Sequence, residues 1–398
     1  MLRFYDQALD APSRLRAGTH RAASLAQTWK RFAPAMKRAG ITRIADLTGL
    51  DDLGIPVHAA IRPFGRSLST QQGKGLSHEA ARVSALMEAL ETWTAEELAI
   101  PKLRGSANGL AKKHNVVDIS ALPRGPHALD HDARWDWVEG FDLVAGEPVL
   151  VPAQAVTLDT TQVDLPNKPM IFDVSSNGLA SGNVLVEAMV HGLAEVIERD
   201  AEAAWRRAGG DLRLVLDTLA DPACTELIAR ITRRGSRVFV WDLTNEIGLC
   251  TIGCAIVEDP REPTWRALGC YQGFGAHLVP EVAIARAVTE AAQTRLTYIA
   301  GGRDDFFAAD YARATDPDIL AEVWGQLARP CDEPVMLDDL PRYAPRSLGE
   351  ALEMQVELAV TAGCEQIIVV DLTHRQLGVP VVKVIVPGRA TDVEALGG

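Results

Sequence analysis

Three segments of the chain carry polar side chains at positions i, i+4 and i+7 among apolar neighbours. At about 3.6 residues per turn, these spacings place each triplet on one narrow stripe of a helix. Most of the side chains are carboxylates, whose oxygens are the ligands that Mg²⁺ prefers, and stripes on separate helices can converge on one cleft. The triplets are Ser84, Glu88 and Glu91; His191, Glu195 and Glu198; and Arg286, Glu290 and Gln293.

Four glutamates form the candidate metal site. Glu88 and Glu91 on one helix, like Glu195 and Glu198 on another, have a like-charged neighbour on their own stripe, which is destabilising unless a cation relieves it. Such an oxygen-rich set suits Mg²⁺ that also holds waters and nucleotide phosphates. The competing interpretation is that these are solvated faces of ordinary amphipathic helices.

Basic residues near the stripes are candidates to bind phosphate. Arg199 follows Glu198, and Arg286 and Arg295 lie on the third helix. A guanidinium binds phosphate oxygens in bidentate fashion, although each of these arginines taken alone is more often a surface residue. Lys74, in a Gly-Lys-Gly turn before the first helix, offers an anion contact or marks a plain helix entry.

Two familiar motifs are excluded. The turn around Lys74 is no Walker A loop, because the leading G-x-x-x-x is missing and Gly separates Lys from the following Ser. No G-x-S-x-G elbow of a serine hydrolase occurs.

Composition narrows the class of protein. The chain has 398 residues, 47% of them hydrophobic and 23% charged, and no apolar run approaches the roughly 20 residues that span a bilayer. A net charge of −13 argues against broad nucleic-acid binding. We therefore expect no nucleic acid and no membrane as partners. Without the apolar core of a secretory signal, a cytoplasmic location is expected.

The six cysteines are predicted to be structural thiols. Cys250 and Cys254 are the only close pair, and C-x₃-C without a second pair or a nearby His is a poor zinc signal.

Helices and hairpins must position the polar stripes. Helical periodicity is found near Ser24 to Arg38 and over about 77–99, 184–207 and 280–299, and alternating apolar residues predict strands in 41–63 and a hairpin in 134–158. Segments 236–259 and 365–388 repeat the order strand, Asp-Leu-Thr, Gly-containing loop, strand, each after a helical segment. We predict an α/β (α+β) fold of helix-plus-hairpin units, with antiparallel or mixed sheets covered by helices.

On these residues the chain resembles the YcaO family of cyclodehydratases and thioamide-forming enzymes. The matching segments are GTHR at 18–21, ITRIADLTGLDDLGIP at 41–56, IRPFGRSLSTQQGKGLSHEAARVSALMEALE at 61–91, SGNVLVEAMVHGLAEVIERDA at 181–201 and ARAVTEAAQTRLTYIAGGRDD at 285–305. The resemblance implies a YcaO-type fold with an N-terminal arm and small subdomain over 1–60, a catalytic domain over 61–398, and an ATP site between helices.

The resemblance also implies roles for single residues. In this family the patterns S-x-x-x-E-x-x-E and E-x-x-E-R bind Mg-ATP, which implies Ser84, Glu88, Glu91, Glu195, Glu198 and Arg199. Asn183, Glu187, Arg286 and Glu290 are then expected to complete the nucleotide site. A basic N-terminal residue at the phosphates is implied as well, with Arg16 and Arg21 as candidates.

The activity implied is ATP-driven chemistry on a peptide or protein substrate. Family members are thought to phosphorylate a backbone amide oxygen and expel phosphate, leaving an azoline, a thioamide or an amidine. The N-terminal pattern resembles members that work with a TfuA-type partner, thought to supply sulfide, and the chain ends in VPGRATDVEALGG rather than the Pro-rich tail of many azoline formers. Thioamide formation is therefore expected first.

Two alternatives stay open. One is an azoline- or amidine-forming cyclodehydratase, and the other is a non-catalytic nucleotide-binding accessory or ribosome maturation factor. A homodimer is the default expectation for the assembly.

Overall fold

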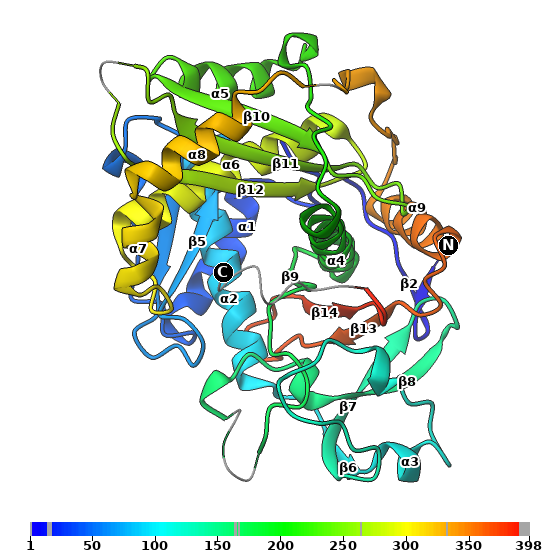
Figure 1. The fold of residues 1–398 in the computed structure, drawn as a ribbon. Helices are drawn as coiled ribbons and strands as arrows, with labels where there is room; N and C mark the ends of the chain where they lie inside the picture. The colour runs from blue at the N-terminus through cyan, green and yellow to red at the C-terminus, as the bar shows by residue number, and fades with distance from the viewer. Residues whose placement is uncertain are drawn as a thin grey trace.

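The computed structural model describes residues 2–13, 18–162, 165, 168–262, 265–331 and 333–389, so Arg16 lies outside the described residues. All ladders between the named strands are antiparallel, and helices pack on the sheets (Figure 1). The predicted fold class is confirmed. Within these ranges, no helix is long and apolar enough to cross a membrane.

The first sheet supports the first glutamate helix. Its strands run in the order β3 (Arg43–Asp46), β4 (Val57–Ile61) and β5 (Thr70–Lys74). Helix α2 (His78–Glu97) packs on this sheet and begins where Ser77 accepts a hydrogen bond from the Ala80 N–H. Before the sheet come strands β1 (Arg3–Phe4) and β2 (Gln7–Ala8), and helix α1 (Leu25–Phe32), which contacts α2.

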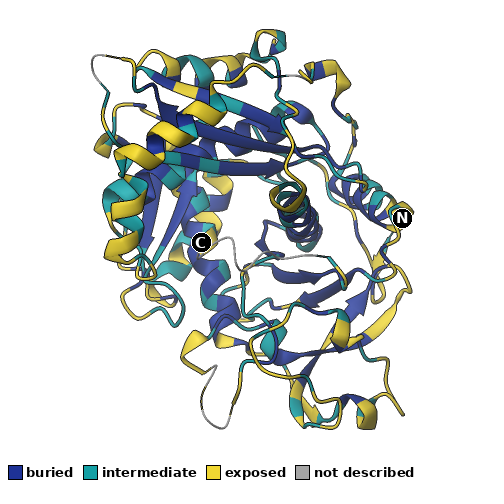
Figure 2. Ribbon diagram, viewed as in Figure 1, coloured by how far each residue is buried: buried dark blue, intermediate teal, exposed yellow. Residues whose placement is uncertain are grey.

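A second sheet supports the third predicted helix. It consists of β10 (Ser236–Asp242), β11 (Thr251–Glu258) and β12 (Cys270–Ala276), with α6 (Pro280–Ala300) packed on it. Helix α5 (Pro222–Thr232) contacts α6 and β10. Helices α7 (Ala308–Ala314) and α8 (Pro317–Leu327) follow and are largely exposed (Figure 2).

The largest sheet lies under the central helix. Its strand order is β6 (Leu103–Gly105), β7 (Trp135–Asp142), β13 (Ile368–Asp371), β14 (Val381–Ile385) and β9 (Leu179–Ser181), and β8 (Glu147–Pro152) also pairs with β7. Helix α3 (Ala107–Leu110) follows β6. Helix α4 (Leu185–Ala208) contacts β9 and β14 of this sheet, β12 of the second sheet and α9 (Leu348–Thr361), so it lies between the two sheets (Figure 1).

Most predicted elements are confirmed. The long helices end within a residue or two of their predicted limits, and the hairpin in 134–158 turns at Gly146, whose φ of 72° suits glycine. The repeated segments are the hairpins β10–β11 and β13–β14, each preceded by a helix. The division of the chain at residue 60 stays a prediction, and β4 runs across it.

Two glycines bring helices close to their sheets. A Cβ on Gly73 of β5 would lie 2.0 Å from the backbone nitrogen of Ala85 in α2, and a Cβ on Gly273 of β12 would lie 2.2 Å from that of Ala291 in α6. Only glycine permits such contacts, so these positions set the height of α2 and α6 above their sheets.

Gly273→Ala is expected to destabilise the protein by about 3 kcal/mol or more, because the added methyl meets helix backbone that cannot yield locally. Gly325→Ala in α8 is the matched control, since a Cβ there meets nothing within 4 Å and alanine favours a helix. Urea unfolding midpoints followed by circular dichroism measure both. Equal midpoints for the two variants would contradict the packing described.

Candidate functional site

Glutamates from three helices meet between the sheets. Helix α2 provides Glu88 and Glu91, α4 provides Glu195 and Glu198, and α6 provides Glu290; we call these five the glutamate cluster. The charges of Glu88 and Glu195 act on Glu91, and the charge of Glu290 acts on Glu88 and Glu198. The polar stripes therefore converge on one region of the molecule.

Basic side chains border the glutamate cluster. Lys74 Nζ lies 2.7 Å from Glu290 Oε2. Arg199 Nη2 lies 3.8 Å from Glu198 Oε1 and 3.8 Å from Glu290 Oε1, and Arg286 Nη2 lies 4.0 Å from Glu198 Oε2. The contacts of both arginines with the cluster are longer than hydrogen bonds, and Arg199 instead donates from Nη1 to Glu202 Oε2 at 2.7 Å. Both guanidinium groups therefore keep donors for another anion.

One of the arginine donors beside the glutamate cluster is unused within the described residues. Arg286 Nε is buried and has no hydrogen-bond partner there. A buried donor without a partner costs free energy that an anionic ligand would recover. The donor set thus fits a phosphate beside carboxylates.

Burial raises the pKa of the carboxyl groups on α2 and α4. It raises the pKa of Glu88 and of Glu195 to about 7, and that of Glu91 well above its usual range. The pKa of Glu198 is raised as well, again mainly by burial, although Arg199 opposes the rise. These carboxylates therefore lack enough positive charge around them in the protein itself.

Glu290 differs from the other four. Burial alone would raise its pKa, but the charges of Lys74 and Arg199 outweigh burial and lower the pKa to about 2. Glu290 is thus ionised throughout the physiological range and binds Lys74 directly, whereas the hydrogen bond of Arg199 runs to Glu202.

Water reaches part of the cluster. The Glu88 side chain is exposed to solvent and those of Glu91 and Glu195 are partly exposed, whereas Glu198 is only 2% exposed and accepts a hydrogen bond of 2.7 Å from the Ala276 N–H. The side chain of Glu88 is exposed, yet burial raises its pKa. Both hold if protein surrounds the carboxylate on most sides while water still reaches it. That water moderates the rise of the pKa without reversing it.

The carboxylates do not close on a single point. Among the described residues, the one group of three acidic, His or Cys side chains with ligand atoms within 4.8 Å of one another lies elsewhere. The spacing within the glutamate cluster leaves coordination positions for phosphates and waters, which Mg²⁺ commonly keeps in proteins.

A cavity adjoins the cluster. It is partly open to solvent, and its lining includes Arg21, Glu187, His191 and Arg286. His191 lies one turn before Glu195 on α4. The cavity and the cluster therefore share Arg286 and one face of α4.

Asn183 and Glu187 hold the N-terminal arm at this cavity. Glu187 accepts hydrogen bonds from the Ala22 N–H at 2.8 Å and from Arg21 Nη1 at 3.4 Å. Asn183 donates from Nδ2 to Glu187 Oε1 at 3.1 Å, and its Oδ1 accepts from Thr28 Oγ1 at 2.8 Å. These two predicted nucleotide contacts thus bind chain segments that precede α2, and Glu187 alone of the pair reaches the cavity lining.

Ser84 and Arg295, both predicted at the nucleotide, differ in their placement. Ser84 lies on α2 one turn before Glu88 and is partly exposed. Arg295, by contrast, is fully buried and binds Asp51 at 3.1 Å and Glu258 at 3.2 Å. The interpretation of Arg295 as a phosphate contact is therefore wrong, because its guanidinium joins the β3–β4 connection to β11.

Sequence reasoning missed Lys383. This buried lysine of β14 donates to the Ser175 carbonyl at 2.6 Å, and burial lowers its pKa to about 8 while Glu195 and Glu91 oppose that shift. The signal was present, because Lys383 is the only charged residue in the apolar run GVPVVKVIVPG. A charge in such a strand needs a partner.

Comparison with known proteins identifies relatives over nearly the whole chain. The family model described as YcaO cyclodehydratase, ATP- and Mg²⁺-binding, matches residues 72–390. A relative in Rhizobium leguminosarum bv. trifolii, described as an uncharacterized protein in the tfuA 3′ region, is 35% identical over 94% of this chain and 89% of its own length.

Solved structures share the fold. The structure of YcaO from Methanopyrus kandleri bound with AMPPCP and Mg²⁺ is 28% identical, covers 97% of both chains and has a TM-score of 0.76. A heterocyclase in complex with substrate and cofactor has a TM-score of 0.80 at 22% identity, which shows the fold alone. The match covers 97% of this chain and 54% of the heterocyclase chain.

Glu195→Gln is expected to stabilise the ligand-free protein well above pH 7. Since burial raises the folded-state pKa from 4.5 to about 7, ionisation opposes folding, and stability falls as the pH rises through this window. Glutamine removes that cost, so the gain in melting temperature should vanish below about pH 4.5, where the carboxyl is protonated in both states.

Glu226→Gln is the control of opposite sign. The hydrogen bond from Arg230 lowers the pKa of Glu226, so its ionised form favours folding and the substitution should not stabilise at high pH. Thermal melts across pH measure both variants. A loss of stability in Glu195→Gln above pH 7 would show that Glu195 is a structural ion-pair partner instead.

Proposed function

Because the chain belongs to the YcaO family, whose members are described as ATP- and Mg²⁺-binding, we propose that it activates a backbone amide of a peptide or protein for attack by a nucleophile. The observation that carries the proposal is the convergence of five glutamates from α2, α4 and α6 beside Lys74, Arg199 and Arg286. Such a set combines metal ligands with phosphate donors.

The proposed assignments follow from this arrangement. Mg²⁺ is held by Glu88, Glu91, Glu195 and Glu198. The charge of the metal favours the ionised carboxylates and so offsets the burial that raises their pKa values. The nucleotide contacts are Ser84, Lys74, Arg199, Arg286 and Glu290, together with Arg21, Asn183 and Glu187 at the arm. Arg16 belongs to the same proposal, outside the described residues.

The proposed reaction must overcome the low reactivity of the amide. Resonance makes the carbonyl a poor electrophile and its oxygen a poor leaving group. When bound, ATP supplies the phosphoryl group that turns this oxygen into a leaving group, with Mg²⁺ neutralising the triphosphate. Arg286 and Arg199 offset negative charge on the phosphate oxygens. Before any ligand binds, Glu290 keeps Lys74 in position and Glu202 keeps Arg199 in position.

Thioamide formation, with sulfide delivered by a TfuA-like protein, is the product we propose. The relative in the tfuA 3′ region and the N-terminal sequence pattern support it. The azoline- or amidine-forming alternative uses a side chain or a backbone amine of the substrate as nucleophile. A non-catalytic accessory protein that binds Mg-ATP would use the same carboxylates, so only the product of the reaction separates it from an enzyme. Homodimer formation in the cytoplasm belongs to the same proposal.

Mg-ATP binding should be lost in Glu88→Ala and in Glu198→Ala, because each variant removes a metal ligand. Calorimetry with and without Mg²⁺ measures the affinity, and circular dichroism checks the fold. Glu226→Ala on α5 is the control, since this exposed residue pairs only with Arg230 and Arg233 in the described residues. Undiminished Mg-ATP binding in both site variants would contradict the assignment of the metal.

The product is tested by mass spectrometry of a candidate peptide incubated with the protein, ATP, sulfide and a TfuA-like partner. Exchange of oxygen for sulfur, seen as the corresponding mass increase and only with ATP, is the expected result. Loss of one water without added sulfide identifies the cyclodehydratase alternative. The accessory role is supported if the protein binds Mg-ATP but changes neither the peptide nor the ATP.

A further inference from the structure

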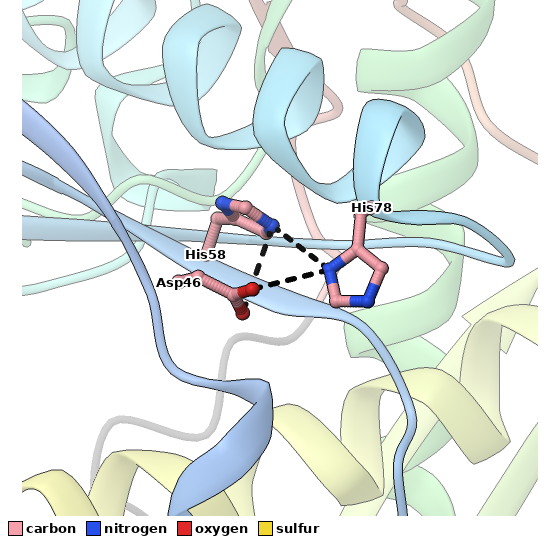
Figure 3. Close-up of side chains that lie close together, drawn as sticks. All are labelled: Asp46, His58 and His78. Atoms are coloured by element: carbon pink, nitrogen blue, oxygen red, sulfur yellow. Dashed lines mark hydrogen bonds and ion pairs between the residues drawn. The ribbon is translucent and has the colours of Figure 1, made fainter.

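Three metal-binding side chains lie together outside the glutamate cluster. Asp46 ends β3, His58 lies in β4, and His78 is the first residue of α2 (Figure 3). Asp46 and His58 are direct partners in the β3–β4 register, which turns their side chains to the same face of the sheet. The start of α2 brings His78 over that face.

The three ligand groups form a small triangle. Asp46 Oδ2 lies 3.3 Å from His78 Nδ1, His78 Nδ1 lies 3.4 Å from His58 Nε2, and the other carboxylate oxygen, Asp46 Oδ1, lies 3.7 Å from His58 Nε2. Zn²⁺ binds nitrogen and oxygen at about 2.0–2.2 Å, which puts neighbouring tetrahedral ligands about 3.3–3.6 Å apart. With one ligand atom from each residue, the three atoms lie within 4.8 Å of one another, so small side-chain shifts bring them to one face of a zinc tetrahedron.

Protons satisfy this arrangement poorly. The carboxylate of Asp46 only accepts, and its contact with His58 is too long for a hydrogen bond. Two donors or two lone pairs facing each other at 3.4 Å would repel, so the two imidazoles form only one long hydrogen bond, and only when one nitrogen carries a proton and the other accepts it. One cation within reach of all three groups would satisfy every ligand atom at once.

The surroundings hold the ligands in place. The His58 side chain is 9% exposed, and its other nitrogen, Nδ1, has no hydrogen-bond partner in the described residues. Asp46 Oδ1 accepts the Thr48 N–H at 2.9 Å, which orients the carboxylate. Asp46 and His78 are 50% and 60% exposed, so the fourth corner of the tetrahedron faces solvent.

We propose that Asp46, His58 and His78 bind one Zn²⁺, or a similar first-row divalent ion, with an open fourth position for water or an exogenous ligand. Imidazole nitrogens favour such ions over Mg²⁺, which separates this site chemically from the glutamate cluster. The ion joins β3 and β4 to the start of α2. Glu88 lies ten residues further along α2, about 15 Å away at the usual rise, so the ion anchors the helix without entering the cluster.

The test uses Co²⁺ as a coloured substitute for Zn²⁺. Metal-free full-length protein is titrated with Co²⁺ in excess Mg²⁺, which occupies the carboxylate sites. We expect one Co²⁺ per chain with the intense visible absorption of tetrahedral cobalt, bleached by Zn²⁺. His78→Ala and Asp46→Asn should each weaken binding by at least about tenfold, since even loss of an outer-shell partner has that effect.

His114→Ala is the matched control, an exposed histidine away from the triangle that should leave Co²⁺ binding unchanged. Zn²⁺ should also raise the melting temperature of the wild type and of His114→Ala but not of His78→Ala. The proposal is overturned if the wild type takes up no Co²⁺ in excess Mg²⁺, or if His78→Ala binds it with the same affinity and spectrum. Because both altered ligands are largely exposed, circular dichroism should show an intact fold.

Discussion

Burial of several carboxylates between three helices is the constraint on which the rest of the structure depends. Burial raises the pKa values of Glu88, Glu91 and Glu195, and like charges nearby raise that of Glu91 further, so the ligand-free protein pays to keep them ionised. Such groups would move into water if their helices were free to shift. Their convergence therefore requires helices that the surrounding sheets fix firmly, and a cation is the ligand that turns this cost into binding free energy.

The sheets provide that firmness in two ways. Helices α2 and α6 each pack on a three-stranded antiparallel sheet, and each approaches its sheet at a glycine, Gly73 or Gly273, where no side chain separates the backbones. Helix α4 is held differently, between the large sheet and β12. The packing thus fixes all three helices, and the charges of their glutamates act on one another across the region where the helices meet.

The sequence predicts the features that local patterns determine, and it does not predict those that depend on tertiary contacts. The stripes at i, i+4 and i+7 and the apolar periodicity locate the helices, and the hairpin signals locate the strands, because both are set by neighbours along the chain. Whether Arg286 or Arg295 faces the glutamates depends on which side of α6 meets the sheet, and here the prediction for Arg295 was wrong. The pairing of Asp46 with His58 can be recognised only once the register of β3 and β4 is known. The role of Lys383 likewise depends on carboxylates from other elements of the fold.

The N-terminal arm is part of the site for an electrostatic reason. Glu187 is only 3% exposed, and a carboxylate so buried is stable only when it is paired. Its partners are Arg21 and the Ala22 N–H of the arm, while Asn183 beside it binds Thr28. Both residues lie at the start of α4, whose later turns carry Glu195 and Glu198. Displacing the arm would therefore remove the Arg21 and Ala22 contacts of Glu187 and leave it the hydrogen bond from Asn183, on the same helix that the proposed metal site uses. A buried carboxylate with fewer partners favours the arm in its bound position.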